Sequence, residues 1–325
     1  MQAQEYAAAR WAIGLRLPRA NDAEIAAAFD AGRILRTHVL RPTWHFVAPP
    51  DIRWMLELTS PHVHRAMAYQ RRQLELDVRV CTRAIDLIER ALAEGTYLTR
   101  AELGARLARS RIQATGNRLA HLAAYAELEG VICSGPRRDT QFTYALLATR
   151  APGARRLPRD EALAELTRRY FQSHGPATIR DFVWWSGLTT ADAKRGLAMN
   201  KARSRVSDGL TYWTLGRASA SRRSRAGVYL LPVYDEYVVA YRDREAVPHR
   251  PPGDAAAGGV ATFQNALVIA GQIAGTWQAV RRAGAVVVAV APARRLSASE
   301  RQSLAVTAAR YGRFLDAPVS LSVSV

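Results

Sequence analysis

One arrangement of predicted elements occurs twice in this chain of 325 residues and limits the folds open to it. Residues 82–94 have the apolar spacing of an amphipathic helix, and Thr99 with Glu102 forms a capping box that opens a short second helix. A third helix is predicted over 113–129. Two extended segments, VICS and QFTYALL, then follow within 131–147 around the basic turn GPRRD. The sequence therefore predicts three helices closed by a hairpin.

The same order returns after residue 150, so the chain contains a divergent repeat. Residues 160–174 form a predicted helix, 179–186 a second, and 191–200 a third that Thr189 caps. Extended sequence follows at 203–217. The period of about 80 residues is that of a small domain and exceeds that of a solenoid repeat. Helix, short helix, longer helix and hairpin is the order of a winged helix-turn-helix unit.

The two ends of the chain have different patterns. Near the N-terminus, helices are predicted over 5–16, 22–31 and 52–58, with an extended segment at 34–47 and a basic helical stretch at 62–80. Strands are predicted at 228–231, 236–241, 266–270, 273–277, 285–291 and 319–325, with one helix at 298–312. The expected fold class is α+β, mainly helical, with tandem winged-helix units and a β-rich C-terminal domain. The expected boundaries are 1–80 (a winged-helix unit lacking its first helix), 81–150, 151–227 and 228–325.

Charge favours a polyanionic partner. Lysine and arginine number 46 against 28 acidic residues, a net charge of +18, and only Lys194 and Lys201 are lysines. A field of that size favours binding to nucleic acid, with acidic lipid or simple solubility as the alternatives. No apolar run is long enough to span a membrane, and no signal peptide is visible. Two distant cysteines, Cys81 and Cys133, form neither a disulfide framework nor a zinc site. We expect a cytoplasmic, nucleoid-associated protein.

The common catalytic motifs are absent from the sequence. It has no phosphate-binding loop, nucleophile elbow, zinc-protease helix or dinucleotide fingerprint. The seven histidines are scattered, and His62 with His64 lacks the further ligands that a metal site requires. We therefore expect neither a metal nor a cofactor.

Three groups of polar residues remain as candidate sites. Gln2 and Gln4 would face the same way in an extended segment but diverge on a helix, and ordinary surface glutamines are the alternative. Arg41, Thr43 and His45 alternate with apolar residues, which suits phosphate binding or a half-exposed strand. The segment PVYDEY, which contains Asp235 and Tyr237, follows an apolar strand and suits either acid–base work or a capped strand end.

Together these groups indicate a family. The segments QAQEYAAARWAIGLR, ILRTHVLRPTWHFVAPPDIRWML, LLPVYDEYVVAYRDR and IAGTW occur in the order found in the bacterial winged-helix DNA glycosylases of the AlkZ and YcaQ type, and the sequence resembles that family over essentially its whole length. The resemblance implies three winged-helix units around a DNA-binding channel. It also implies hydrolysis of the N-glycosidic bond of N7-alkylated purines, including bulky adducts and interstrand crosslinks, by a monofunctional and monomeric enzyme on double-stranded DNA.

The resemblance also assigns roles to residues. The family motif is glutamine, an apolar residue, then glutamine or aspartate, so Gln2 and Gln4 would hold a water beside the anomeric carbon. Here the motif begins at the second residue, whereas the family has a helix or more ahead of it. Arg41, Thr43 and His45 would line the lesion or phosphate channel, and Asp235 and Tyr237 would support the active site. The residues expected to bind the DNA backbone are Lys201, Arg203, Arg205, Arg222, Arg223 and Arg225.

Two other functions are consistent with the same pattern. A non-enzymatic winged-helix regulator would explain the repeats and the charge, although no heptad or dimerisation helix is present. An RNA-binding protein is less favoured because no RRM or KH signature occurs. Footprinting on one sequence, with no abasic product on alkylated DNA, would indicate the regulator.

Overall fold

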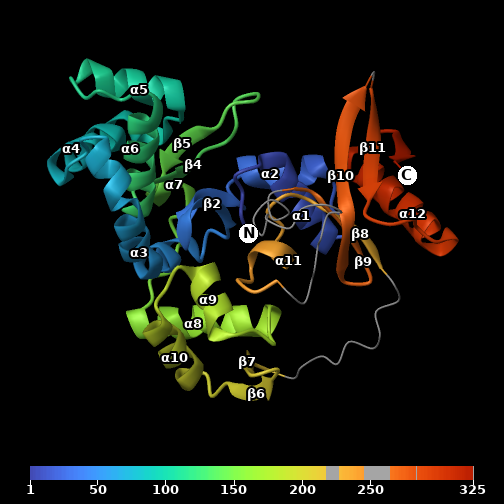
Figure 1. The fold of residues 1–325 in the computed structure, drawn as a ribbon. Coiled ribbons are helices and arrows are strands. Elements are labelled where there is room, and N and C mark those ends of the chain that lie inside the picture. Colours follow the sequence, from blue (N-terminus) through green and yellow to red (C-terminus); the bar gives the residue numbers. More distant parts are fainter. Residues whose placement is uncertain (217–226, 245–263, 283, 325) are drawn as a thin grey trace. The chain divides into compact units, whose positions relative to one another are not determined.

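The computed structural model describes residues 1–216, 227–244, 264–282 and 284–324. Its contacts divide the chain into two compact units (Figure 1). The terminal unit joins both ends of the chain, Met1–Ala26 with Ser219–Val325, and the central unit is Ala27–Ala218. Residues 1–26, which the sequence grouped with residues 27–80, therefore pack with the C-terminal segment. The boundaries between winged-helix units stay a prediction.

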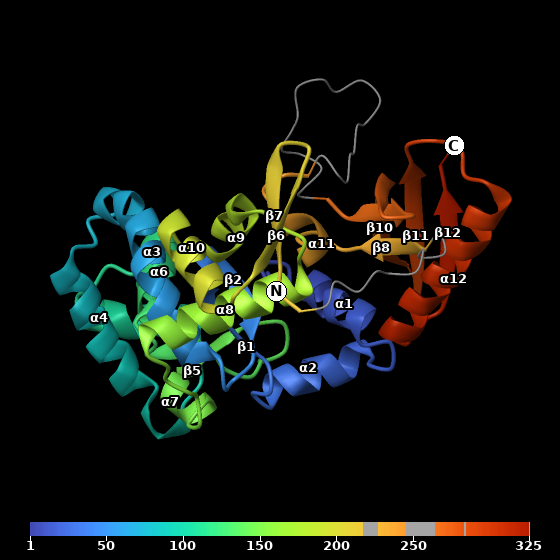
Figure 2. The ribbon, with the colours of Figure 1, turned by 90° about the horizontal axis from the view of Figure 1, so that it is seen from below.

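The terminal unit is built on a five-stranded sheet in the order β12-β11-β10-β9-β8 (Figures 1 and 2). Its strands are β8 (Val228–Leu231), β9 (Ala266–Ile269), β10 (Gln272–Arg282), β11 (Ala285–Pro292) and β12 (Val319–Val323). Neighbouring strands are antiparallel except β11 and β12. A parallel pair needs a long crossover, which α12 (Ala298–Leu315) supplies.

Helix α1 (Tyr6–Arg16) packs within the terminal unit through Trp11. The Trp11 indole donates to the carbonyl oxygen of Leu230 at 2.7 Å, and its ring lies 4.9 Å from that of Tyr311 and 5.0 Å from that of Phe314. A Cβ on Gly14 would lie 2.5 Å from the Phe314 ring, so only glycine permits this close approach of α1 to α12. Helix α2 (Asp22–Asp30) follows α1.

The predicted strand over 236–241 is wrong, because the structure has the short helix α11 (Glu236–Val239) there. The Asp235 carboxylate accepts a hydrogen bond from the main-chain N–H of Tyr237 at 2.9 Å and caps the helix. The run EYVVAY has strand-forming residues, but the cap before it and the burial of Val238 and Val239 select the helix.

In the central unit, β1 (Leu35–Val39) and β2 (Arg41–Val47) form the predicted extended hairpin. Helix α3 (Ile52–Gln73) then continues through Pro61, where the sequence predicted two helical stretches. Proline costs one main-chain hydrogen bond inside a helix. Burial compensates for that loss, since the side chains of Val63 and Met67 join those of Ala124 and Leu128 in one apolar cluster.

The first complete set of repeated elements follows α3. Its elements are α4 (Val78–Ala91), the 3-10 helix Ala93–Gly95, β3 (Leu98–Thr99), α5 (Arg100–Arg109), α6 (Gly116–Leu128), β4 (Ile132–Ser134) and β5 (Thr143–Leu146). The capping box of Thr99 and Glu102 is present as predicted. The strands form a small sheet in the order β3-β5-β4.

The second set has α8 (Arg159–Ser173), α9 (Ile179–Ser186), α10 (Thr190–Met199), β6 (Arg203–Ser207) and β7 (Leu210–Thr214), after the short helix α7 (Leu147–Arg150). In both sets the segment between the first two helices pairs with the last strand. Leu98 and Thr99 pair with β5, and Ala177 pairs with Trp213 of β7. No helix in the described ranges is both long and apolar enough to cross a membrane.

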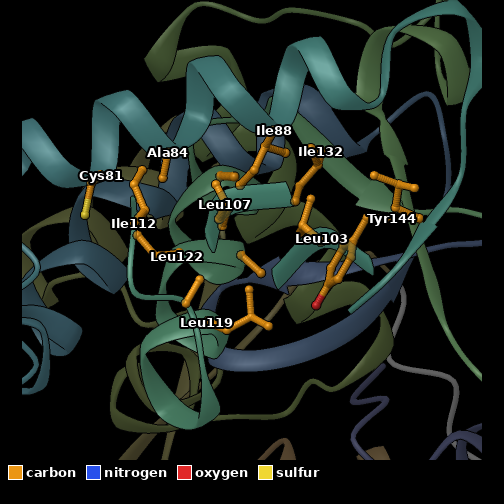
Figure 3. Close-up of a cluster of buried hydrophobic side chains, with 14 of the residues drawn as sticks. Cys81, Ala84, Ile88, Leu103, Leu107, Ile112, Leu119, Leu122, Ile132 and Tyr144 are labelled. Carbon is orange, nitrogen blue, oxygen red and sulfur yellow. The ribbon is translucent and has the colours of Figure 1, made fainter. Parts of the chain in front are cut away.

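A substitution in the apolar core of the first set of repeated elements should have a large effect on stability. Ile88 of α4 is fully buried and packs among the leucine and isoleucine side chains of α5, α6 and β4 (Figure 3). Replacing Ile88 by alanine should lower the free energy of unfolding by about 2–5 kcal/mol, measured in urea, because it leaves a cavity. Val78 of the same helix is 71% exposed, and Val78→Ala should change stability little. Equal losses in both variants would contradict this packing.

Candidate active site

The Gln2–Gln4 segment precedes α1 and lies outside the helix. Gln2 makes an isolated β-bridge and is 8% exposed, and Ala3 between the two glutamines is fully buried. Non-helical backbone avoids the divergence that a helix would impose on side chains two residues apart. The two carboxamides are therefore not separated by helical geometry.

The Gln4 side chain carries a buried acceptor. Its Oε1 atom is shielded from solvent, and no hydrogen-bond donor among the described residues lies within reach of it. Leaving a buried polar atom unsatisfied costs about 1–3 kcal/mol, so such atoms in folded proteins call for an explanation in function or in an ordered water. The side-chain carbonyl oxygen of Gln4 is thus able to accept a hydrogen bond from a water or substrate.

An ion pair anchors the C-terminal end of α1. The Arg16 guanidinium donates to both carboxylate oxygens of Asp235, at 2.9 and 2.8 Å, and the Asp235 side chain is fully buried. The hydrogen bond to Asp235 raises the pKa of Arg16, against the opposing effect of burial. Asp235 therefore links α1, the helix that follows the two glutamines, to α11. It also caps α11.

Other contacts hold the start of α1 and the residues around α11. Arg10 pairs with Asp22 at 2.9 Å and lies over the Tyr6 ring at 4.6 Å. Burial raises the pKa of Asp22, and the charge of Arg10 opposes that shift. The Tyr237 hydroxyl donates to the carbonyl oxygen of Gly271 at 2.7 Å, and burial raises its pKa. Tyr237 thus links α11 to the turn before β10 and carries a protonated hydroxyl at neutral pH.

The structure places the second predicted group on β2 of the central unit. Arg41 donates to the carbonyl oxygen of Trp184 at 3.3 Å, and His45 bonds through Nδ1 to the carbonyl oxygen of Thr43 at 2.9 Å. His45 is only 1% exposed, although simple alternation would place it on the more polar face with Arg41 and Thr43. Trp44 is half-buried and lies 4.2 Å from the Arg36 guanidinium.

Three of the residues expected to bind the DNA backbone lie on, or just before, the hairpin of β6 and β7. Lys201 and the strand residues Arg203 and Arg205 are exposed. Asp208 and Gly209 both have positive φ, as a two-residue type I′ hairpin turn requires. This hairpin presents basic side chains to solvent. The predicted backbone contacts Arg222, Arg223 and Arg225 lie outside the described residues.

A buried ionisable pair lies beside β2. His38 Nδ1 makes a very short contact with Glu127 Oε2, and the His38 main-chain N–H donates to the same oxygen at 3.0 Å. The pair joins β1 to α6. Within the ranges that the structure covers, no three His, Cys, Asp or Glu side chains are grouped to hold a metal ion.

The sequence did not indicate a cavity that the terminal unit contains. It has a volume of about 680 Å³ and is lined by residues of α1, β10, α12 and the turns beside them. Trp11, Trp277 and Tyr311 contribute its aromatic walls. Trp11 lies more than 260 positions before Trp277 and Tyr311 in the chain, and no local motif links it to them.

Three comparisons with known proteins find the same kind of protein over most of the chain. A family model described as "DNA glycosylase AlkZ-like" matches residues 1–314. The "Interstrand DNA cross-link repair glycosylase" of Streptomyces sahachiroi is 25% identical over 307 residues, 86% of this chain and 80% of that protein. The solved structure of Streptomyces sahachiroi DNA glycosylase AlkZ matches with a TM-score of 0.78 at 22% identity, over 99% of this chain and 90% of that one. The likeness to the solved structure is one of fold, and the family match spans nearly the whole sequence.

Proposed function

Because the chain belongs to the AlkZ-like DNA glycosylase family and so hydrolyses N-glycosidic bonds in DNA, we propose that Gln2 and Gln4 position the attacking water. The proposed substrate is an N7-alkylated purine in double-stranded DNA. The oxygen of the water would bond to the anomeric carbon as the glycosidic C–N bond breaks. The electrons of that bond would remain on the base and neutralise its positive charge, and the water would release a proton to solvent.

Uncharged glutamines suit this reaction. An N7-alkylated purine is cationic and leaves readily, so its departure needs no strong acid. Catalysis then depends on holding the water and on stabilising positive charge that develops on the sugar, which a fixed carbonyl dipole does. A carboxamide is too weak a base to deprotonate the water early, so the protonation state of the site does not limit activity near neutral pH.

One observation carries the proposal: the buried, unsatisfied Oε1 atom of Gln4. A water beside the reacting carbon would supply the donor that this oxygen lacks among the described residues. Gln2, buried two residues earlier, supplies a second carboxamide of the same motif. Arg16, Asp235 and Tyr237 support the proposal indirectly, because they fix α1 and α11 within the terminal unit.

We extend the proposed substrates to bulky adducts and interstrand crosslinks. The support is the Streptomyces sahachiroi relative, whose name states crosslink repair. We also propose that Arg41, Thr43 and His45 line the lesion or phosphate channel, where the buried His45 would orient its neighbours and the less buried Arg41 would meet phosphate. Arg222, Arg223 and Arg225 remain proposed backbone contacts from the sequence alone.

We predict that the salt dependence of DNA binding comes in part from Lys201, Arg203 and Arg205. Each phosphate contact releases counterions, so replacing one of these residues by alanine should lower the slope of log K against log salt by about 0.9. Binding should weaken similarly on all sequences. Val206 is 68% exposed on the same hairpin and uncharged, so Val206→Ala is the matched control. If all three basic residues are replaced by alanine together and the slope stays unchanged, the hairpin does not contact the DNA.

Incubation with duplex DNA that carries N7-methylguanine tests the proposed function directly. We expect release of free N7-methylguanine and an abasic site that alkali cleaves. A substrate with an N7–N7 interstrand crosslink should be unhooked in the same assay. DNA binding without any abasic product would overturn the proposal and favour a non-enzymatic DNA-binding protein.

A further inference from the structure

Trp184 of α9 is the most exposed of the seven tryptophans. It is 45% exposed, whereas the other six, all within the described ranges, are buried or half-buried. The next residue, Trp185, packs inward, and its ring lies 5.0 Å from that of Tyr170. A single exposed apolar side chain is common on protein surfaces and by itself indicates nothing. Any function of Trp184 must therefore show in the residues around it.

Two arginines flank the exposed indole. Arg180 precedes Trp184 by four residues, so both side chains lie on one face of α9, and they are the two exposed residues of that helix. From β2, the Arg41 guanidinium lies 5.9 Å from the centre of the Trp184 ring and donates to its main-chain carbonyl oxygen at 3.3 Å. Asp181, the one carboxylate of α9, is buried in the capping box with Thr178. The exposed face of α9 is thus aromatic and basic, without an acidic side chain.

The backbone that carries Trp184 is fixed at both ends of α9. At its start, the Thr178 hydroxyl accepts from the main-chain N–H of Asp181 at 3.2 Å, and the Asp181 carboxylate accepts from that of Thr178 at 2.9 Å. At its end, Gly187 has a φ of 71°, and a Cβ there would lie 2.2 Å from the carbonyl oxygen of Leu40, between β1 and β2. Only glycine permits this close approach to the hairpin. A group on such a fixed support loses less entropy when it binds a ligand.

An exposed aromatic ring among arginines is the arrangement with which proteins bind unpaired nucleic-acid bases. The flat faces of base and indole stack, while the guanidinium groups contact the neighbouring phosphates. In an intact duplex, both faces of each base are covered by the adjacent base pairs, so an indole has no face to stack on. A base becomes accessible when its pair opens. The exposed face of α9 therefore favours DNA in which a base pair has opened.

We propose that Trp184 stacks on a DNA base whose pair has opened and that Arg180 contacts the adjacent phosphate, an inference that rests on the proposed function. Enzymes that remove a base cannot reach it inside the stacked duplex, so base removal requires such opening. Unstacking is unfavourable, and stacking on the indole offsets part of that cost. Trp184 thus stabilises the opened DNA without touching the bond that breaks.

Binding to two duplexes of equal length tests the proposal. One is fully paired, and the other has a single base opposite an abasic-site analogue. We expect the wild-type protein to bind the second about tenfold more tightly. Trp184→Ala should abolish this preference and Trp184→Phe should retain part of it, while both bind the paired duplex as the wild type does. Tyr69 is 65% exposed on α3 of the same unit, and Tyr69→Ala should keep the full preference.

The contrary result is clear. A preference that persists in Trp184→Ala would come from recognition of the abasic analogue itself and would overturn the proposal. Equal binding of the two duplexes by the wild-type protein would also overturn it.

Photocrosslinking locates the contact. When 5-iodouracil is the unpaired base, irradiation joins it to an aromatic ring stacked on it, with loss of HI. Trypsin should then release the crosslinked base on the peptide of residues 181–194, with the adduct on Trp184. An adduct on Trp185, or on Trp44 of β2, would contradict the proposed stacking.

Arg180→Ala separates charge from stacking. It should lower the slope of log K against log salt by about 0.9 and leave the preference for the unpaired base intact, whereas Trp184→Ala should leave the slope unchanged. An unchanged slope in Arg180→Ala would overturn the phosphate contact. These assays need no base release. Preference and crosslink without release from alkylated DNA would refute the proposed function alone, and release by a protein without the preference would refute the stacking alone.

Discussion

Replacing Gln4 by alanine should reduce the rate of N7-methylguanine release from duplex DNA by about a hundredfold in single-turnover assays. Alanine removes the one buried carbonyl oxygen of the motif that has no donor among the described residues. The water would then be held less firmly at the anomeric carbon, and its orientation accounts for much of the barrier. Gln2→Ala should also reduce the rate.

The double variant sharpens this test. If both glutamines hold the same water, the losses in Gln2→Ala and Gln4→Ala should not multiply in the double variant. DNA affinity should stay close to that of the wild type, since neither carboxamide is charged. Gln302 is exposed on α12 of the same unit, and Gln302→Ala should retain full activity. Unchanged release in both single variants would mean that the motif has no catalytic part.

Replacing Arg16 by alanine should lower the free energy of unfolding by about 3 kcal/mol in urea. The Asp235 carboxylate is fully buried and would lose the cation that now donates to both of its oxygens. Removing one partner of such a pair usually costs 3–5 kcal/mol, and about 3 allows for the 43% exposure of the Arg16 side chain. Base release should fall as well, because the two glutamines directly precede α1.

Two further variants separate the ion pair from general loss of charge. Arg19 is exposed just beyond the end of α1, and Arg19→Ala should leave stability nearly unchanged. Adding Asp235→Asn to Arg16→Ala should restore part of the stability, because the amide oxygen can still cap α11 while the uncompensated charge is gone. A loss in Arg19→Ala as large as that in Arg16→Ala would show that the pair has no special role.

Local signals predicted most elements well. The predicted capping box at Thr99 and the predicted cap at Thr189 mark the starts of α5 and α10, and both are present in the structure. Side chain to main chain bonds of this kind span three residues, so the sequence contains all their partners. The helix through Pro61 and the helix α11 in place of a strand were missed, because burial against distant residues outweighed local preference there.

In the candidate site, too, features that depend on neighbouring residues could be predicted and features that depend on distant residues could not. Gln2 and Gln4 are two residues apart, and a motif of that length can be recognised from sequence. The partner of Arg16 is 219 residues away at Asp235, and nothing in the pattern around either residue indicates the other. Burial could not be predicted either: His45 alternates with apolar residues as an exposed position would, yet it is 1% exposed.

The sequence by itself determined the repeated elements, the basic charge, the glutamine motif and the family, because each depends on residue identity and short spacing. The tertiary structure decided that α1 packs with the C-terminal sheet, that Asp235 is fully buried against Arg16, and that Trp11, Trp277 and Tyr311 line one cavity. These features form only when segments nearly 300 residues apart exclude water from one another. That packing is a property of the folded chain, and no local pattern records it.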